Sequence, residues 1–345
     1  MRKKYDLLFV TNLPSFYKVN LYNELSKKCS IKVIFLSFTS EIRSSDFSSA
    51  EINFDYEVLS SKDYEKRNIF STALKLIHII CRVQFHKVIF SGWESRELLP
   101  IMIFLPRRLC GIVIESSIIE SKTKGFFWLL KKIVLKNMSV AFPSGFLQQE
   151  ILNKAKFKGI IKVTHGVGVM NKHSERLCNS NYNINSFKYL YVGRMAEEKN
   201  LRCLVNLFNK SKKSLTMVGG GPLFEELKKT ANNNIKFLGY INNKNLADIY
   251  LSHDIFILPS NSEPWGLVID EALWFGLPVV VSCNVGCSED LVIKAKTGTV
   301  FDLNNDFSFN NALSEVELNY SKYKKNVMKI DFDKRDQDQI DSYLS

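Results

Sequence analysis

The chain has 345 residues, of which 46% are hydrophobic, 12% aromatic and 24% charged. This composition excludes a disordered or collagen-like chain, and the length allows about two domains. Apolar stretches stay below the ~18 residues of a membrane-spanning helix, and the first residues run directly into a strand-like stretch, so we expect neither a span nor a signal peptide. The seven scattered cysteines lack the paired spacing of a metal site, which favours a cytoplasmic protein with reduced thiols.

The excess positive charge lies in the first half of the sequence. Residues 1–170 contain 26 Lys and Arg against 14 Asp and Glu, a net charge of +12, whereas residues 171–345 contain 21 of each. A general lysine bias of the proteome would raise the net charge of both halves alike. The asymmetry therefore favours an anionic partner for the first half. We expect no nucleic acid, because this half has no recognised binding motif and no repeated aromatic platform.

Short apolar stretches alternate with helical periodicity along the whole chain. The predicted strands of the first half are 7–11, 31–38, 87–90, 111–114, 140–142 and 161–164. Those of the second half are 188–192, 214–218, 235–237, 255–258, 278–282 and 298–301, with helices at 201–209, 222–230, 245–252 and 266–275. This alternation predicts an α/β protein of two Rossmann-like, doubly wound domains facing each other across a cleft.

The domain boundaries follow from a change in composition. The stretch 171–185 is polar and Asn-rich without periodicity, and is the predicted linker between domains at 1–170 and 186–330. Residues 331–345 are expected to form a polar C-terminal helix appended to the second domain.

Ligands of open parallel sheets bind beyond the carboxyl ends of the strands, so the loops after the strands are the place to look for a site. The strand 188–192 is followed by Gly193 and by the cations Arg194 and Lys199 near the start of a helix, an arrangement that suits a diphosphate. The next strand ends in three glycines at 219–221, where a ligand or another backbone can approach closely. Taken alone, the two cations are also compatible with a solvated surface pair.

Two glutamates stand eight positions apart after the strand 255–258. Glu263 lies at the mouth of a helix and Glu271 a little over two turns along it, a rise of roughly 12 Å. Paired glycosidase carboxylates stand only ~5–9.5 Å apart, so these two acids are more compatible with gripping separate parts of one long ligand. The alternative is that Glu263 merely satisfies the helix dipole and Glu271 lies on the surface.

Several distinct motifs follow one another between about residues 186 and 302. They are Tyr191-Val192-Gly193-Arg194 with Lys199, Val218-Gly219-Gly220-Gly221-Pro222, Phe237-Leu238-Gly239-Tyr240, Glu263-Pro264-Trp265-Gly266-Leu267-Val268, Glu271-Ala272-Leu273, Gly276-Leu277-Pro278-Val279-Val280 and Glu289-Asp290-Leu291-Val292. With this spacing the second half resembles the retaining glycosyltransferases of family 4, which have the GT-B fold.

The resemblance implies a role for each matching residue. Arg194 and Lys199 would neutralise the donor diphosphate and the leaving group. Glu263 would bind hydroxyls of the donor sugar near the reacting carbon, and Glu271 would hold the ribose. The other donor-site residues that it implies are Gly193, Gly219, Gly220, Gly239, Tyr240, Ser262, Trp265, Gly266 and Leu267. The family usually has Phe at position 265, so Trp265 could reshape the sugar pocket.

A nucleoside-diphosphate leaving group allows catalysis to be largely electrostatic. Cationic side chains and a helix end supply the positive charge, and no Asp-x-Asp follows a predicted strand, so we expect no metal and no cofactor beyond the donor substrate. The resemblance implies retention of configuration by front-face attack, with the departing phosphate helping to deprotonate the acceptor hydroxyl and no enzymic nucleophile.

The first half is the expected acceptor-binding domain. Its candidate acceptor residues are Tyr17 and Lys18, in the segment after the first strand, and Glu115, after the strand 111–114; a structural role is the alternative for Glu115. Many relatives have Gly-Gly in the first of these loops and a His near position 115, so neither a backbone phosphate contact nor a catalytic histidine is expected here.

The basic, aromatic segment 122–136 is a candidate membrane element. Helical spacing predicts that Phe126, Leu129, Leu130, Ile133 and Val134 face the core. The candidate membrane residues outside that stripe are Trp128, Lys131, Lys132 and Lys136, together with Phe127 and Leu135. An ordinary core helix is the alternative.

These features lead to one functional expectation. The chain would transfer a sugar from a nucleotide sugar to a glycan acceptor on an isoprenoid-diphosphate lipid, at the inner face of the cell membrane. A role in bacterial surface polysaccharide, such as O-antigen, lipopolysaccharide or capsule, follows from the family and the charge. The alternatives are a catalytically inactive GT-B protein that binds nucleotide sugars and an epimerase-like one.

Overall fold

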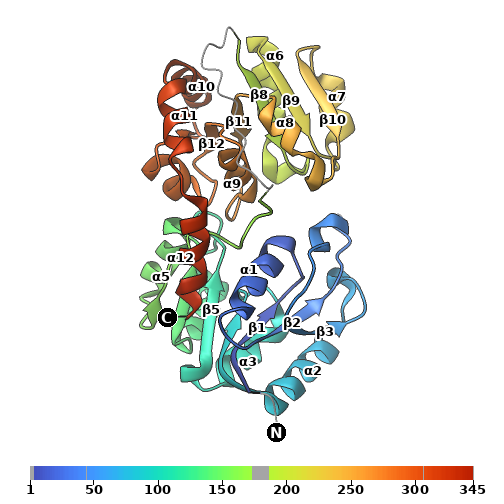
Figure 1. Cartoon of the computed structure of the whole chain (residues 1–345), viewed down its shortest axis with the longest axis vertical. Coiled ribbons are helices and arrows are strands. Elements are labelled where there is room, and N and C mark those ends of the chain that lie inside the picture. Colours follow the sequence, from blue (N-terminus) through green and yellow to red (C-terminus); the bar gives the residue numbers. More distant parts are fainter. Residues whose placement is uncertain (1–3, 44, 173–185, 306, 345) are drawn as a thin grey trace. The chain divides into compact units, whose positions relative to one another are not determined.

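The structure is a computed structural model that describes residues 4–43, 45–172, 186–305 and 307–344. The chain forms two compact units: unit 1 contains Met1–Asn171 and Asp333–Ser345, and unit 2 contains Lys172–Phe332. Each unit is built on one parallel sheet (Figure 1). The predicted pair of doubly wound, Rossmann-like sheets is therefore confirmed. The predicted linker 171–185 lies outside the described residues from position 173 onward.

The sheet of unit 1 has seven strands in the order β3-β2-β1-β4-β5-β6-β7. Its strands are β1 Lys4–Thr11, β2 Ile31–Ser37, β3 Asp55–Ser60, β4 Gln84–Phe90, β5 Cys110–Ile114, β6 Val140–Pro143 and β7 Ile160–Ile161. Its α-helices are α1 Phe16–Ser26, α2 Ile69–Arg82, α3 Leu99–Phe104, α4 Gly125–Lys136, α5 Phe146–Ala155 and α12 Phe332–Leu344, which begins at the last residue of unit 2. The single-turn helices are η1 Ser45–Ser48, η2 Tyr64–Lys66, η3 Arg96–Leu98 and η4 Arg107–Leu109.

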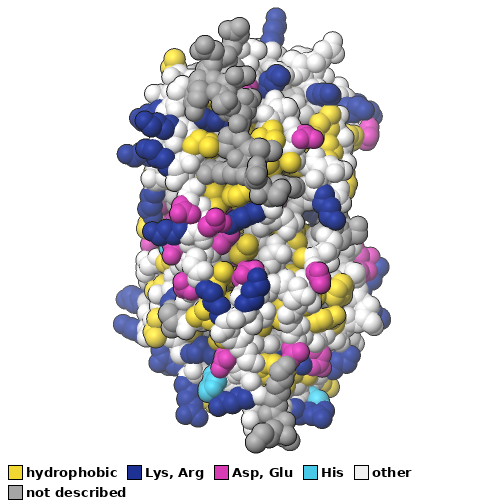
Figure 2. Space-filling view, viewed as in Figure 1, with side chains coloured by type: hydrophobic (Ala, Val, Ile, Leu, Met, Phe, Trp, Pro, Cys, Tyr) yellow, Lys and Arg dark blue, Asp and Glu magenta, His cyan; other side chains and the backbone are white. Residues whose placement is uncertain are grey.

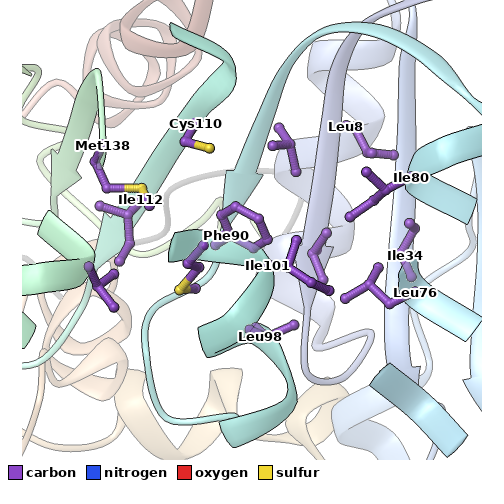
Figure 3. Packing of buried hydrophobic residues seen from close by; sticks show 14 of the residues in the cluster. Leu8, Ile34, Leu76, Ile80, Phe90, Leu98, Ile101, Cys110, Ile112 and Met138 are labelled. Atoms are coloured by element: carbon purple, nitrogen blue, oxygen red, sulfur yellow. The ribbon is translucent and has the colours of Figure 1, made fainter. Parts of the chain in front are cut away.

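Two apolar layers cover the two faces of this sheet. On one face, side chains of β1, β2, β4 and β5 pack against α2, α3, α4 and α5, as Figure 3 illustrates with Leu8, Ile34, Phe90 and Ile112 opposite Leu76, Ile80 and Ile101. On the other face α1 and α12 pack against the same strands. This division follows from right-handed crossovers, because the chain moves along the sheet in opposite directions on its two faces.

The sheet of unit 2 has six strands in the order β10-β9-β8-β11-β12-β13. Its strands are β8 Lys188–Val192, β9 Ser214–Val218, β10 Ile235–Gly239, β11 Ile255–Leu258, β12 Val279–Ser282 and β13 Gly298–Phe301. Its helices are α6 Leu201–Ser211, α7 Phe224–Thr230, α8 Ala247–Leu251, α9 Leu267–Trp274, α10 Ser308–Leu318 and α11 Tyr320–Met328, with the short η5 Glu197–Lys199, η6 Asn243–Asn245 and the π-helical η7 Ser288–Lys294.

The predicted place of the C-terminal helix is wrong. We expected this helix to be appended to the second domain, but from Asp333 onward it belongs to unit 1. Tyr343 stacks on Phe142 of β6, with ring centroids 4.5 Å apart, and meets Phe9 of β1 edge-on. Ile340 joins the same apolar layer. These few apolar side chains, among many acidic ones, decide the docking.

The predicted core stripe of 122–136 is wrong for Phe126, Leu129 and Ile133, whereas Val134 is buried as predicted. In α4 the side chains of Phe126, Leu129 and Ile133 are exposed, whereas Leu135 is buried and Trp128 packs against the core. The buried face is thus rotated to the side that the sequence pattern assigned to the outside. Apolar residues lie all around this helix, so periodicity alone did not identify its inner side.

Within the described ranges, no helix combines the length and the apolar character needed to cross a bilayer.

The docking of α12 leads to a stability prediction. Replacing Tyr343 with alanine removes a buried aromatic ring from between β1 and β6, and should lower the free energy of unfolding of unit 1 by about 2–4 kcal/mol. Hydrogen exchange should then show faster exchange in the strands of unit 1 and unchanged exchange in those of unit 2. The matched control is Leu344→Ala, which alters a more exposed neighbour. Equal protection of unit 1 in wild type and in Tyr343→Ala would contradict the docking.

Candidate functional site

Four loops follow neighbouring strands at the carboxyl edge of the unit 2 sheet. They are the segments after β9, β8, β11 and β12, four strands that lie side by side in that order. Because all are parallel, their loops meet at one edge. The donor-site residues predicted at 193–199, 219–220 and 262–267 lie in three of these loops.

Backbone hydrogen bonds fix the loop that carries Glu263. The amide of Asn261 donates to the carbonyl of Glu198 (2.8 Å), and the amide of Ser262 donates to the same carbonyl (3.3 Å). On the other side, the carbonyl of Glu263 accepts from the amide of Gly286 (2.8 Å), and Glu263 forms a parallel bridge with Val285. The backbone at Glu263 is thus tied to the loops after β8 and after β12 before any ligand arrives.

Glycines allow the first two loops to touch each other. Gly219 has φ +131°, and a Cβ atom there would lie 1.9 Å from the carbonyl oxygen of Gly193. The next residue, Gly220, accepts a hydrogen bond from the amide of Met195 (2.7 Å). A Cβ atom on Gly220 would meet nothing within 4 Å. Gly219 is therefore required by backbone packing, whereas the space at Gly220 is open.

An ion pair brings two of the predicted catalytic residues together. The ammonium of Lys199 contacts the carboxylate of Glu263, and the two side chains are 17% and 15% exposed. This pair joins the loop after β8 to the loop after β11. It positions a cation and an acid side by side in a half-buried place, where Coulomb interactions are screened less than at the surface.

The third predicted catalytic residue has a partner that the sequence analysis did not assign. Arg194 donates to the carboxylate of Glu198 at 2.5 Å, with both side chains more exposed than the Lys199–Glu263 pair. Burial opposes the ionisation of Glu198, but the hydrogen bond from Arg194, together with a backbone amide and the charges of Arg194 and Lys199, outweighs it and lowers the pKa of this carboxyl group. The spacing of four residues was the available signal, since it brings opposite charges together in a helical turn.

Glu271 lies on α9 and is paired with Tyr250, whereas Glu263 is paired with Lys199. The hydroxyl of Tyr250 on α8 donates to its carboxylate at 3.0 Å. Burial raises the pKa of Glu271 to about 7; the hydrogen bond from Tyr250 lowers it, and the charge of Asp270 adds to the rise. Tyr250 itself is held by stacking on Phe275, with centroids 5.0 Å apart. Sequence reasoning missed Tyr250, because α8 carries no motif.

The predicted donor-site residues around the start of α9 include a glycine that caps the helix and a buried tryptophan. Gly266 has φ +103° and forms the N-cap of α9, so that Leu267 is its first residue. Trp265 is buried, and its indole N–H donates to Asp270 at 2.8 Å. Its ring thus fixes the helix start from inside the unit.

The predicted donor-site residues Gly239 and Tyr240 lie next to the glycine turn at 219–221. The carbonyl of Gly239 accepts from the amide of Gly219 (2.8 Å), Gly239 has φ +71°, and the side chain of Tyr240 is exposed. A path of backbone contacts therefore runs from Gly239 through Gly219 to Gly193.

Two of the acceptor-side candidates of unit 1 also form an ion pair. Lys18 of α1 and Glu115, which follows β5, form an ion pair of 2.8 Å. Burial opposes protonation of Lys18, but the charge of Glu115 outweighs it and raises the pKa of the ammonium group. Tyr17 packs edge-on against Phe16 and Phe47. The structure thus pairs Lys18 and Glu115, which the sequence analysis had named separately.

Among the residues that the structure describes, no group of three His, Cys, Asp or Glu side chains could hold a metal ion.

The raised pKa of Glu271 predicts how stability depends on pH. The folded state keeps the proton up to about pH 7, whereas the unfolded chain loses it near 4.5, so the free energy of unfolding falls as pH rises through this window. Glu271→Gln removes this term and should flatten the difference in urea stability between pH 5 and pH 8 by about 2–3 kcal/mol. The control is Glu225→Gln on the exposed side of α7. The same pH dependence in wild type and in Glu271→Gln would contradict the burial argument.

Comparisons with known proteins fit this geometry. Residues 179–329 match the family model described as glycosyl transferases group 1. The chain is 35% identical over 118 residues to the sulfoquinovosyl transferase SQD2 of Arabidopsis thaliana, and 32% identical over 146 residues to the O-antigen biosynthesis glycosyltransferase WbnH of Escherichia coli. The aligned parts cover 33% and 41% of this chain, but only 23% of SQD2 and 41% of WbnH.

A solved structure resembles the whole chain. HepE of Anabaena, solved in complex with UDP, aligns with 98% of this chain and 99% of its own at a TM-score of 0.71 and 16% identity. This likeness concerns the fold. The family model thus spans nearly all of unit 2, which resembles the group 1 glycosyltransferases, and the two sheets together have the arrangement of this neighbour, the GT-B fold.

Proposed function

We propose that the protein is a retaining glycosyltransferase that moves a sugar from a nucleoside-diphosphate sugar to a glycan or lipid-linked glycan acceptor. The observation that carries the proposal is the Lys199–Glu263 ion pair, held at the carboxyl edge of the unit 2 sheet by the backbone contacts of its loops. It offers a cation for a phosphate and an acid for sugar hydroxyls at one place.

The donor would be bound along this edge. Arg194 and Lys199 bind the diphosphate, assisted by backbone amides at the start of α9, of which Leu267 is the first residue. Glu263 accepts hydrogen bonds from donor-sugar hydroxyls, and Glu271 accepts them from the ribose. The remaining donor contacts that we propose are Gly193, Gly219, Gly220, Gly239, Tyr240, Ser262, Trp265 and Gly266.

The chemistry proposed is electrostatic. As the bond between the anomeric carbon and the phosphate oxygen breaks, negative charge grows on the β-phosphate, and Arg194 and Lys199 stabilise it without a metal ion. The acceptor hydroxyl forms the new bond on the same face, and its proton passes to the departing phosphate, so that configuration is retained. The loop of Glu263 is fixed beforehand, which keeps the reorganisation on binding small.

The acceptor would be bound by unit 1 through Tyr17, Lys18 and Glu115. We propose a glycan on an isoprenoid-diphosphate lipid, in bacterial surface polysaccharide synthesis at the inner face of the cell membrane. Support comes from the +12 net charge of residues 1–170 and from the O-antigen role in the name of WbnH. Figure 2 shows many Lys and Arg side chains on the surface of unit 1.

Two glutamate variants test the proposal. Screening nucleotide sugars by thermal shift should identify the donor. Glu271→Ala should then weaken donor binding about 10- to 100-fold, because it removes the hydrogen bonds between this carboxyl group and the ribose. Glu263→Ala should lower turnover about 100-fold or more and leave donor affinity largely intact, since the freed Lys199 still meets the diphosphate.

The control for both is Glu225→Ala on α7. Release of nucleoside diphosphate must depend on added acceptor in the wild type. Release without acceptor dependence, or binding without any release, would contradict the transferase and favour an epimerase-like or inactive nucleotide-sugar binder.

A further variant tests whether Glu198 competes with the diphosphate for Arg194. In Glu198→Gln the guanidinium loses its carboxylate partner, so nucleoside-diphosphate affinity should rise about two- to fivefold at low salt, and the gain should disappear at high salt. Calorimetric titration at two salt concentrations measures this change.

The matched control is Glu197→Gln, which removes the same charge one residue earlier but from the partner of Arg202. An equal gain in both variants would indicate a general charge effect and contradict the competition.

A further inference from the structure

The outer sides of α2, α3 and α4 expose large apolar side chains. Phe70 on α2 is 83% exposed, Phe104 at the end of α3 is 85% exposed, and Phe126 on α4 is 74% exposed. The three helices pack on the same face of the unit 1 sheet. We infer that their outer sides form a lipid-facing surface that binds an anionic bilayer. This deepens the proposed function, from which it takes only the lipid-linked acceptor.

The apolar stripe of α2 faces directly away from the sheet. Phe70, Leu74 and Ile77 are exposed, and at 3.6 residues per turn they lie on one side of the helix. Leu76 and Ile79, on the opposite side, are buried in the core. A stripe of this kind is typical of a helix that covers a core on one side and meets another apolar phase on the other.

The helix α4 repeats this arrangement with added charge. Phe126, Leu129 and Ile133 form its exposed stripe, and Lys132 and Lys136 flank that stripe on one side. Apolar side chains beside lysines suit the boundary between lipid headgroups and acyl chains. The charged residues that do the flanking are thus Lys132 and Lys136, whereas Lys131 is half-buried, with its ammonium 4.8 Å from the centre of the Trp93 ring.

The charges of these helices favour an anionic bilayer over a protein partner of mixed charge. The segments α2, α3, η4 and α4 contain no Asp or Glu. Their cations are Lys75, Arg82, Arg107, Arg108, Lys131, Lys132 and Lys136. Cations this close to an anionic membrane surface are attracted to its headgroups.

A groove beside the stripe of α4 has the same chemistry. It lies where α3, α4 and α5 end, has a volume of about 800 Å³, and none of its lining residues, all within the described chain, is acidic. Apolar side chains such as Ile133 and Phe157 line it together with Arg107, Lys132, Lys136, Lys156 and Lys158. A lipid phosphate with the first part of its acyl chains fits such a lining.

Stabilisation of helix ends explains only some of these cations. Arg107 donates to the carbonyls of Met138 and Lys158, and Lys136 lies in the last turn of α4, where the dipole favours a positive charge. Lys132 lies a full turn before the end of α4, and neither effect applies to the exposed phenylalanines. Their common location on one face is what the lipid surface explains.

Sedimentation with vesicles tests the inference. The full chain should sediment with vesicles of phosphatidylcholine and phosphatidylglycerol, and much less with phosphatidylcholine alone. Lys132→Glu with Lys136→Glu should weaken binding to the anionic vesicles about tenfold or more. Phe70→Ser with Leu74→Ser and Ile77→Ser on α2, and separately Leu129→Ser with Ile133→Ser on α4, should each weaken it to a similar extent. All these positions are exposed, so the fold should be retained.

The matched controls lie in unit 2. Phe307→Ser with Leu318→Ser removes two exposed apolar side chains, and Lys210→Glu with Lys228→Glu reverses two exposed charges. Both should leave sedimentation unchanged. Donor binding measured by thermal shift in the absence of vesicles should be the same for all these variants, which separates this test from that of the transfer reaction.

Three results would overturn the inference. One is sedimentation of the α4 variants at the wild-type level. Another is sedimentation of the α2 variant at the wild-type level, because the inferred surface requires the exposed stripe of α2. The third is a concentration-dependent dimer that the same substitutions abolish, without any binding to vesicles, because the face would then join two copies of the chain.

Discussion

The backbone contacts among four loops are the constraint on which the site depends. The carbonyl of Glu198 holds the amides of Asn261 and Ser262, and the carbonyl of Glu263 is held by Gly286. These bonds join the ends of β8, β11 and β12, so that side chains more than sixty positions apart in the sequence meet at one place. The backbone of Glu263 is held by main-chain hydrogen bonds, so substitutions of its side chain can change the chemistry of the site while the loop stays in position.

The charges of the site neutralise one another in the absence of a ligand. Lys199 is paired with Glu263, and Arg194 with Glu198. An anionic ligand such as a diphosphate therefore competes with carboxylates that already pair with these cations. The exposed Arg194 pair is worth little by itself, because solvent screens it, whereas the half-buried Lys199 pair defines the geometry. Glu271 differs from both, since its partner Tyr250 is neutral and burial keeps its pKa near 7.

The sequence predicted most of the unit 2 framework and less of unit 1. Strands such as β11 and β12 are short, continuous apolar stretches buried on both faces, a pattern that periodicity detects well. The missed strand β3 lies at a sheet edge and is polar and half-buried, so it carries no such signal. Motif spacing placed Arg194 and Lys199 at the site, but their acidic partners depend on how loops meet in space, which no local pattern records.

The charges of unit 1 are distributed unequally over the two faces of its sheet. The helix α12 carries four aspartates against two cations and docks on the face that α1 covers, where Asp341 pairs with Lys28 at 3.3 Å. Part of the positive excess of residues 1–170 is thus balanced within unit 1. On the opposite face α2, α3 and α4 have no acidic residue, so the excess there is left to solvent or to a partner. Since apolar side chains are exposed on the same helices, charge and hydrophobicity mark one surface, and the anionic lipid phase that we infer would satisfy both at once.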